Sequence, residues 1–205
     1  GLKTAWVDFT QPAALEQIQS QKPAMVWLES PTNPLLKVID LEAVCAITQP
    51  LGIPVVVDNT FATALVQRPL DLGATLSLTS TTKYINGHSD ALGGAVCTND
   101  PEWHQKMVFS QKALGLQPSP FDCWLITRGI KTLPLRLKQQ MANAAALADQ
   151  LAGHAKVNWV RYPHRSDHPQ HQVATRQMRA GGAIVTASFN ASQEQTYALC
   201  KQLRW

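Results

Sequence analysis

The sequence lacks the long apolar segment that a membrane protein would need. A spanning helix requires about 20 consecutive apolar residues, and runs such as Ile53–Val57 are far shorter. No basic, apolar and small-residue pattern opens the chain, so no secretory signal is indicated. GxGxxG and Walker sequences are also absent, and with them the common glycine-rich phosphate loops. We therefore expect a protein without a membrane partner.

Cysteine is scarce and scattered. The four residues, Cys45, Cys97, Cys123 and Cys200, form no CxxC pair, which argues against a paired metal or redox motif. Scattered thiols in a chain of this length are typical of reduced cytoplasmic proteins. The hydrophobic fraction of 45% and the charged fraction of 16% are ordinary for a soluble globular protein. The expected location is the cytoplasm.

A histidine run raises the question of a metal site. His164, His168 and His171 have an HxxxHxxH spacing that zinc could use. Pro163 and Pro169 interrupt any helix there, so the imidazoles would not share one face. We expect no metal.

Positive charge is modest, with a net value of +4 spread along the chain. The densest basic group has the character of a solvated helix face rather than of a nucleic-acid patch. It consists of Arg128, Lys131, Arg136 and Lys138. We expect no nucleic-acid partner.

Four short apolar runs predict buried strands, because their apolarity is continuous rather than alternating. They are residues 23–29, 53–58, 74–79 and 91–98. Between the first two, a helical pattern covers 41–52, with Asp40 as a plausible N-cap. Strand, helix and strand at this spacing form a βαβ unit. The expected fold class is α/β, a parallel-rich sheet with flanking helices.

The second half of the chain is mainly helical. Helices are expected over 101–111, 120–129 and 133–151, the last with a single apolar stripe. Strands over 157–161 and 183–189 and a helix over 192–203 then indicate part of a smaller α+β unit. We therefore predict a large domain over 1–132, a connecting helix over 133–152 and an incomplete domain over 153–205.

Polar groups follow three of the predicted strands, at the edge where parallel sheets bind ligands. Ser80-Thr81-Thr82-Lys83-Tyr84 follows the third strand, and Asp58 stands 25 residues before Lys83. An amine can form a Schiff base with an aldehyde, adjacent hydroxyls can hold a phosphate, and a carboxylate can keep a pyridine nitrogen protonated. Those are the requirements of pyridoxal 5'-phosphate (PLP) chemistry.

Three longer segments resemble the trans-sulfuration (Cys/Met metabolism) family of PLP enzymes. They are Glu29-Ser-Pro-Thr-Asn-Pro-Leu-Leu-Lys-Val38, Val57-Asp-Asn-Thr-Phe61 and Ser80-Thr-Thr-Lys-Tyr-Ile-Asn-Gly-His-Ser-Asp90. Arg128–Leu133 and His168–His171 are similar to later family segments. The resemblance implies fold type I, the aspartate-aminotransferase-like fold.

The resemblance also implies a role for each site residue. Lys83 is the Schiff-base lysine and moves protons on the substrate, and Asp58 pairs with the pyridine nitrogen. Ser80 and Thr82 hold the phosphate, and Asn33 lies near the cofactor's 3-oxygen. The implied reaction cleaves or replaces the γ-substituent of cystathionine or an O-activated homoserine, as cystathionine γ-lyase and γ-synthase do.

The family is about twice as long as this chain and assembles as a homotetramer. We therefore expect an internal fragment that carries the catalytic lysine, with a sulfur amino acid as substrate. Two other readings stay open. The chain could be a catalytically incompetent fragment or scaffold, or it could derive from a β-lyase, methionine γ-lyase or sulfhydrylase of the same family. A non-PLP lysine Schiff-base enzyme would need neither Asp58 nor the paired hydroxyls.

Overall fold

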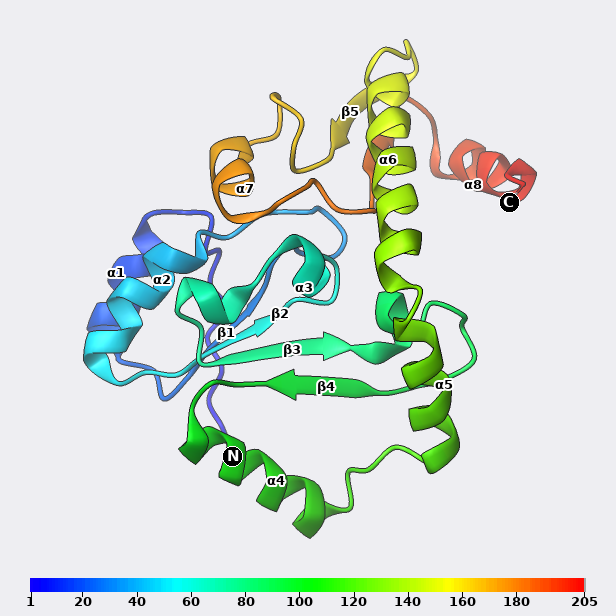
Figure 1. Ribbon diagram of the computed structural model, residues 1–205. Coiled ribbons are helices and arrows are strands. Elements are labelled where there is room, and N and C mark those ends of the chain that lie inside the picture. Colours follow the sequence, from blue (N-terminus) through cyan, green and yellow to red (C-terminus); the bar gives the residue numbers. More distant parts are fainter. Residues whose placement is uncertain (205) are drawn as a thin grey trace.

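A four-stranded sheet forms the centre of the protein, whose residues 1–204 are described by a computed structural model. The strands lie in the order β1 (Val26–Glu29), β2 (Val55–Asp58), β3 (Leu76–Ser80) and β4 (Gly94–Cys97) (Figure 1). The first three are parallel, as expected, and β4 is antiparallel to β3.

The sheet is parallel-rich, as expected, with β4 as its antiparallel edge strand. The connection between β3 and β4, residues 81–93, contains only the helical turn Thr81–Ile85. A parallel neighbour usually follows a crossover that contains a full helix. The chain returns beside β3 without one, so its direction reverses.

Two helices pack against β1 and β2 to form the larger apolar core. They are α1 (Ala13–Gln21), which the sequence patterns did not predict, and α2 (Leu41–Thr48). Asp40 caps α2 as predicted, because its carboxylate accepts a hydrogen bond from Ala43 N. The core between these elements contains Ile18, Val26, Leu28, Ile39, Leu41, Val44, Cys45, Ile53, Val55, Val57 and Ala74. The short helix α3 (Thr63–Val66) follows β2.

Three predicted helices follow the sheet: α4 (Pro101–Leu114), α5 (Pro120–Ile130) and α6 (Leu133–Ala152). Asp100 and Ser119 cap the first two by accepting backbone N–H bonds. The predicted apolar stripe of α6 is confirmed, since Leu137, Ala144 and Ala148 are buried. Its first turns pack in a core with Val38 and Ala62, and its later turns in another core with Val160 and Tyr162. Helix α6 therefore packs against residues that precede it and residues that follow it in the chain.

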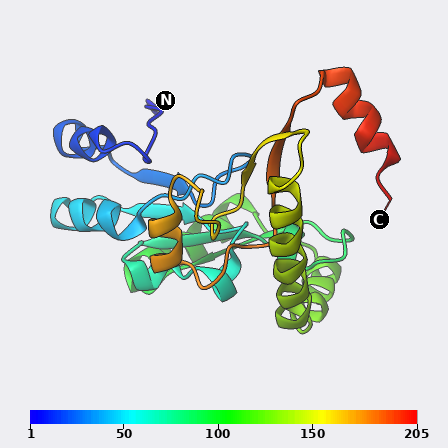
Figure 2. The ribbon, with the colours of Figure 1, turned by 90° about the horizontal axis from the view of Figure 1, so that it is seen from above.

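The last part holds a two-stranded antiparallel sheet, β5 (Val157–Arg161) with β6 (Thr186–Phe189). Between the two strands lies α7 (His171–Gln177), and after them α8 (Gln193–Gln202). Seen from above, α8 extends away from the rest of the molecule (Figure 2). The domain division at 132 and 153 stays a prediction.

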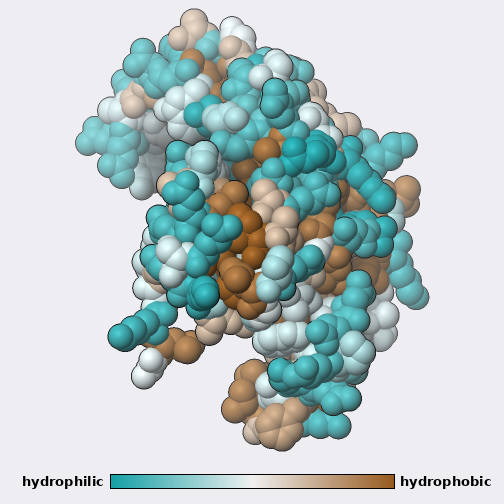
Figure 3. Space-filling model, turned by 90° about the vertical axis from the view of Figure 1, so that its left-hand side faces the viewer, coloured by the Kyte–Doolittle hydropathy of each residue, from teal (hydrophilic) through white to brown (hydrophobic). Residues whose placement is uncertain are grey.

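Apolar side chains reach the surface in several places. Figure 3 shows brown patches among the hydrophilic residues on one side of the molecule. Large apolar side chains that are exposed along α4 and α5 include Phe109, Leu114, Phe121 and Trp124. Within residues 1–204, no helix has the length and apolarity needed to cross a bilayer.

Candidate functional site

The carboxylate of Asp58 lies at the end of β2 and is held by a neighbouring threonine. Its Oδ1 accepts hydrogen bonds from Thr60 N at 2.9 Å and from Thr60 Oγ1 at 2.6 Å. The same Thr60 hydroxyl accepts a bond from Ser80 N at 2.9 Å. One hydroxyl therefore connects the end of β2 to the end of β3.

A second carboxyl group stands beside Asp58. Glu29 is its register partner on β1. Burial raises the pKa of Glu29, the backbone N–H of Asn33 opposes this by donating to the carboxylate, and the Asp58 charge adds to the rise. Glu29 thus supports the loop that carries Asn33.

Behind this edge lies a buried network of amide side chains. Gln67 Nε2 donates to Ser30 O at 2.8 Å and to Asn59 Oδ1 at 3.0 Å. Asn59 Nδ2 donates in turn to Gln67 O. Gln177 Nε2, on α7, donates to Gln67 Oε1 and to Ile39 O. The network fixes the backbone behind Asp58, because buried polar groups in folded proteins almost always keep a hydrogen-bond partner.

Lys83 lies on an irregular turn after β3. The turn Thr81–Ile85 has π-helical bonding, and Lys83 departs from helical geometry with φ −90° and ψ −118°. Thr82 Oγ1 accepts from Gly93 N at 3.0 Å and donates to Gly93 O at 3.3 Å. This arrangement leaves the Lys83 side chain exposed.

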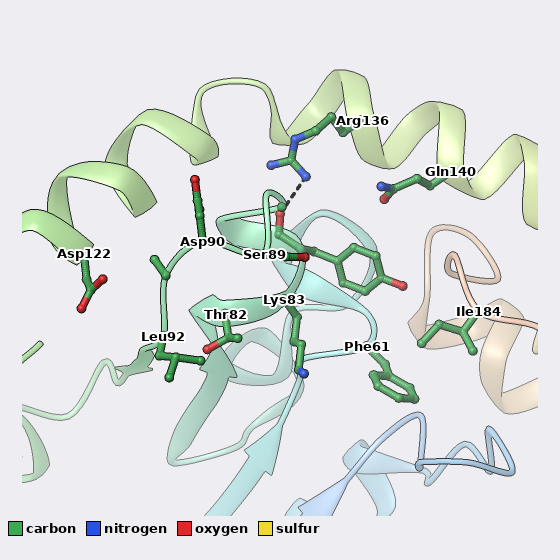
Figure 4. Close-up of a pocket in the computed structure, with 13 residues that line it drawn as sticks. Phe61, Thr82, Lys83, Ser89, Asp90, Leu92, Asp122, Arg136, Gln140 and Ile184 are labelled. Atoms are coloured by element: carbon green, nitrogen blue, oxygen red, sulfur yellow. Dashed lines mark hydrogen bonds between the residues drawn. The ribbon is translucent and has the colours of Figure 1, made fainter. Parts of the chain in front are cut away.

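An open cavity of about 780 Å³ surrounds Lys83. In Figure 4 the Lys83 side chain points between Thr82 and Phe61, with Arg136 and Gln140 on α6 opposite. Tyr84 also lines the cavity, and burial raises the pKa of its phenol. Tyr84 packs against the core around Leu137.

Arg136 differs from its sequence interpretation. It was expected on a solvated face, but its guanidinium donates to Tyr84 O at 2.9 Å, Ile85 O at 3.2 Å and Gly129 O at 3.0 Å. Its Nε donates to Thr132 Oγ1 at 3.0 Å. The reason is position, because the first turn of α6 passes directly over the Lys83 turn. Arg128, Lys131 and Lys138 are exposed as expected.

In the histidine run, His164 and His171 line one cavity, while His168 has a structural role. His168 is buried, its Nε2 donates to Leu36 O at 3.1 Å, and its Nδ1 accepts from Gln170 N at 3.1 Å. This pairing requires the neutral Nε2–H tautomer, and burial correspondingly lowers the pKa of His168. In the described part of the chain, no three His, Cys, Asp or Glu side chains are placed to hold a metal ion.

The predicted site residues share one edge of the sheet but differ in setting. Lys83 and Thr82 line the cavity. Asp58 and Ser80 lie at the ends of adjacent strands, joined through Thr60. Asn33 is exposed on the loop after β1. The residues that sequence reasoning missed, Thr60, Gln67 and Arg136, act through contacts across the fold, for which spacing gave no signal.

The donor set fits PLP. The exposed Lys83 amine suits an aldehyde, and the Asp58 carboxylate suits a pyridine nitrogen. The hydroxyls of Ser80 and Thr82 suit a phosphate. Thr81 Oγ1 is buried and has no partner among the described residues, so the turn also retains hydrogen-bonding capacity. The fold and the donor set fit the class of α/β proteins that bind PLP.

Comparison with known proteins gives the family. The family described as "Cys/Met metabolism PLP-dependent enzyme" matches residues 1–205, and the chain belongs to it. A probable cystathionine gamma-synthase of Herpetosiphon aurantiacus is 42% identical over 204 residues, 100% of this chain and 64% of that protein. A cystathionine gamma-lyase of Dictyostelium discoideum is 42% identical over 203 residues, 99% of this chain and 52% of the relative.

A solved structure agrees with the fold. The cystathionine gamma synthase of Xanthomonas oryzae pv. oryzae, in complex with aminoacrylate and cysteine, is 45% identical with a TM-score of 0.93. The match covers 96% of this chain and 51% of that one. The predicted α/β fold of type I is therefore confirmed. The chain spans from about half to 64% of the length of these relatives.

Proposed function

We propose that these residues form the lysine-bearing part of a PLP-dependent enzyme of sulfur amino-acid metabolism. The enzyme would cleave or replace the γ-substituent of cystathionine or an O-activated homoserine. The observation that carries the proposal is the placement of the Lys83 amine in an open cavity, with hydroxyls and a fixed carboxylate at the ends of β2 and β3. Relatives named gamma-synthase and gamma-lyase support this reaction class.

When bound, PLP supplies an aldehyde that condenses with an amine and a ring that withdraws electrons from the substrate carbon. Asp58 would hold a proton at the pyridine nitrogen, and the two bonds from Thr60 keep the carboxylate in one orientation. Asn33 would bind the 3-oxygen. Lys83 Nζ carries protons to and from the substrate carbons, since a positioned amine is suited to general acid–base work.

Ser80 and Thr82 would bind the phosphate through their hydroxyls. Ser80 Oγ makes no hydrogen bond within the described chain, so its donor is available. Thr82 Oγ1 already accepts from Gly93 N and donates over a longer 3.3 Å to Gly93 O. Turning the Thr82 hydrogen from Gly93 O toward the phosphate keeps the accepted bond and exchanges only the weaker one.

The proposal extends to assembly and location. The exposed apolar side chains of α4 and α5 favour association between copies, because isolated soluble proteins rarely leave large apolar patches uncovered. We propose a homotetramer in the cytoplasm, acting on a sulfur amino acid. Gel filtration with light scattering of the longest reading frame that contains this chain tests the assembly.

Borohydride trapping tests the site. The longest reading frame and the 205-residue chain are each incubated with PLP, reduced and mapped by peptide mass spectrometry. We expect one pyridoxyl group on Lys83, and none after Lys83→Ala. Asp58→Asn is expected to keep the label and lose turnover of cystathionine. Labelling of another lysine such as Lys131, at a level equal to Lys83, would contradict the proposal.

A second candidate follows from length, because the chain spans as little as half of its relatives. The 205 residues alone would then be an incompetent fragment or scaffold. Brisk turnover by the isolated chain would exclude this candidate. A substrate panel of cystathionine, methionine and O-acyl homoserines distinguishes γ-lyase or γ-synthase activity from β-lyase, methionine γ-lyase and sulfhydrylase activities, by the product released.

A further inference from the structure

We propose that Arg136 is the positioning residue for Lys83. Its guanidinium holds the backbone of the Lys83 turn and thereby sets where the amine points. The inference rests on the proposed function only for what Lys83 does, because the contacts themselves are independent of the cofactor.

Arg136 contacts the turn on its carbonyl side. Its Nη1 and Nη2 donate to Tyr84 O and Ile85 O, the two carbonyl groups that follow Lys83, and the first bond is drawn in Figure 4. The turn's own closing bonds run from Asn86 N to Thr81 O and from Gly87 N to Lys83 O, at 2.9 Å and 2.8 Å. Arg136 therefore binds the carbonyl groups that this turn leaves without an internal partner.

The guanidinium has a neutral set of partners. Besides the two turn carbonyls it donates to Gly129 O and Thr132 Oγ1, and it makes no ion pair with a described carboxylate. Hydrogen bonds from a charged donor are about twice as strong as neutral ones. A lysine at this position would place a compact charge there and could not satisfy the same planar spread of acceptors.

Two glycines let the guanidinium and helix α5 approach the turn. A Cβ at Gly87, whose φ is +75°, would lie 2.1 Å from Arg136 Nη1. A Cβ at Gly129 would lie 2.2 Å from Asn86 O. Both positions are therefore restricted to glycine, and the close packing holds Arg136 against the carbonyl groups.

The support behind Arg136 is rigid. The next residue on α6, Leu137, is fully buried in the core that also contains Ala62 and Val66. A functional group is held most accurately when it is supported from a packed helix rather than from a loop. Helix α6 thus provides a fixed frame from which Arg136 positions a turn that is itself irregular.

The experiment compares Arg136→Met and Arg136→Lys with Lys138→Met, an exposed residue two positions along the same helix. The protein is the longest reading frame that contains this chain. One readout is hydrogen–deuterium exchange of the peptide covering 81–87, which needs no cofactor. The other is the initial rate of borohydride-trapped PLP attachment to Lys83, measured as the labelled fraction of the peptide that contains Lys83.

We expect Arg136→Met to speed exchange of the turn and to slow specific labelling of Lys83, each by about tenfold or more, the effect of losing hydrogen bonds to a charged group. Arg136→Lys should recover less than half of either loss on a logarithmic scale. Lys138→Met should match the wild type. Guanidinium, added to Arg136→Ala well below denaturing concentrations, should partly restore the labelling rate.

The outcomes separate the two claims. Wild-type exchange and wild-type labelling of Lys83 in Arg136→Met overturn the positioning role. If no lysine of the wild type is labelled but exchange of the turn still rises in Arg136→Met, Arg136 holds the turn as inferred and the proposed function is wrong. If Arg136→Met does not fold, Arg136→Lys decides, and wild-type behaviour of that variant contradicts the inference.

Discussion

Two loops at the same edge of the sheet are held in different ways. The loop over residues 30–41 is fixed by side chains of a distant segment. The buried ones are neutral: His168 Nε2 donates to Leu36 O, and Gln177 bonds Ile39 O and Leu41 N. At the exposed end of the loop, Arg176 forms an ion pair with Asp40. The turn that carries Lys83 is fixed on one side by Thr82, whose hydroxyl bonds the Gly93 backbone, and on the other by one charged side chain, Arg136. The first loop is anchored by many buried bonds and the second by a few at the rim of a cavity.

The difference corresponds to what each loop does. Buried amides and a neutral imidazole stabilise a loop and keep solvent away from it, because each buried polar group left without a hydrogen bond would cost free energy. A guanidinium at a cavity rim keeps its donors satisfied while the amine beside it stays open to solvent. We infer that the 30–41 loop is built for rigidity and the Lys83 turn for placement with access.

The largest expected effect tests the buried amide network around Gln67. Gln67→Leu removes partners from Ser30 O, Asn59 Oδ1 and Gln177 Nε2. We expect the free energy of unfolding to fall by about 2 to 4 kcal/mol, the cost of several unmet buried groups. Urea denaturation measures it, with Gln172→Leu on the exposed face of α7 as control. A loss below about 0.5 kcal/mol, the range of surface substitutions, would mean that the network adds little.

The next effect is the acid sensitivity of the His168 contact with the 30–41 loop. Burial lowers the pKa of His168 below the usual value near 6.5. Below pH 6.5 His168 binds a proton in the unfolded chain but stays neutral in the folded chain. The stabilisation is therefore fully present above pH 6.5 and decreases as the pH falls. The loss is at most about 1.4 kcal/mol per pH unit for one proton. His164 has its pKa lowered by burial too and adds to the loss.

Denaturation at two pH values, one above and one below 6.5, checks this prediction. His168→Asn should be less stable at the higher pH and should lose less on acidification than the wild type. His104→Gln, an exposed substitution on α4, should leave the acid loss unchanged. An unchanged acid loss in His168→Asn would show that the imidazole is not the group responsible.

The smallest effect concerns the link between the two strand ends. Thr60→Val keeps the shape and removes the hydroxyl that binds Asp58 and Ser80 N. We expect a loss of about 1 kcal/mol in the free energy of unfolding, together with weaker PLP attachment to Lys83. Thr60→Ser should restore both. If Thr60→Val and Thr60→Ser behave alike, the bridge has no role in placing Asp58.

The sequence predicted the parts of the site that depend on local order. Continuous apolar runs gave the strands, and parallel strands bring their carboxyl ends to one edge, so Asp58, Ser80 and Lys83 could be placed together. The apolar stripe gave α6 within one residue at its end. These features follow from periods of a few residues along the chain.

The rest depends on contacts between distant residues. Gln177 meets Ile39 across 138 positions and Arg136 meets Tyr84 across 52, and no spacing rule encodes such pairs. Arg136 in particular was read as one basic residue among several, because its neighbours at Arg128, Lys131 and Lys138 are indeed exposed. The direction of β4 was likewise decided by a short return that the apolar pattern alone did not reveal.

The close approach at Gly129 limits how the protein can vary. Helix α5 rests so near Asn86 that even one methyl group there would displace it. Because Gly129 O is also an acceptor for Arg136, moving α5 would carry that acceptor away. Random mutagenesis should therefore recover no functional substitution at this codon, while exposed neighbours such as Ile130 and Lys131 tolerate many.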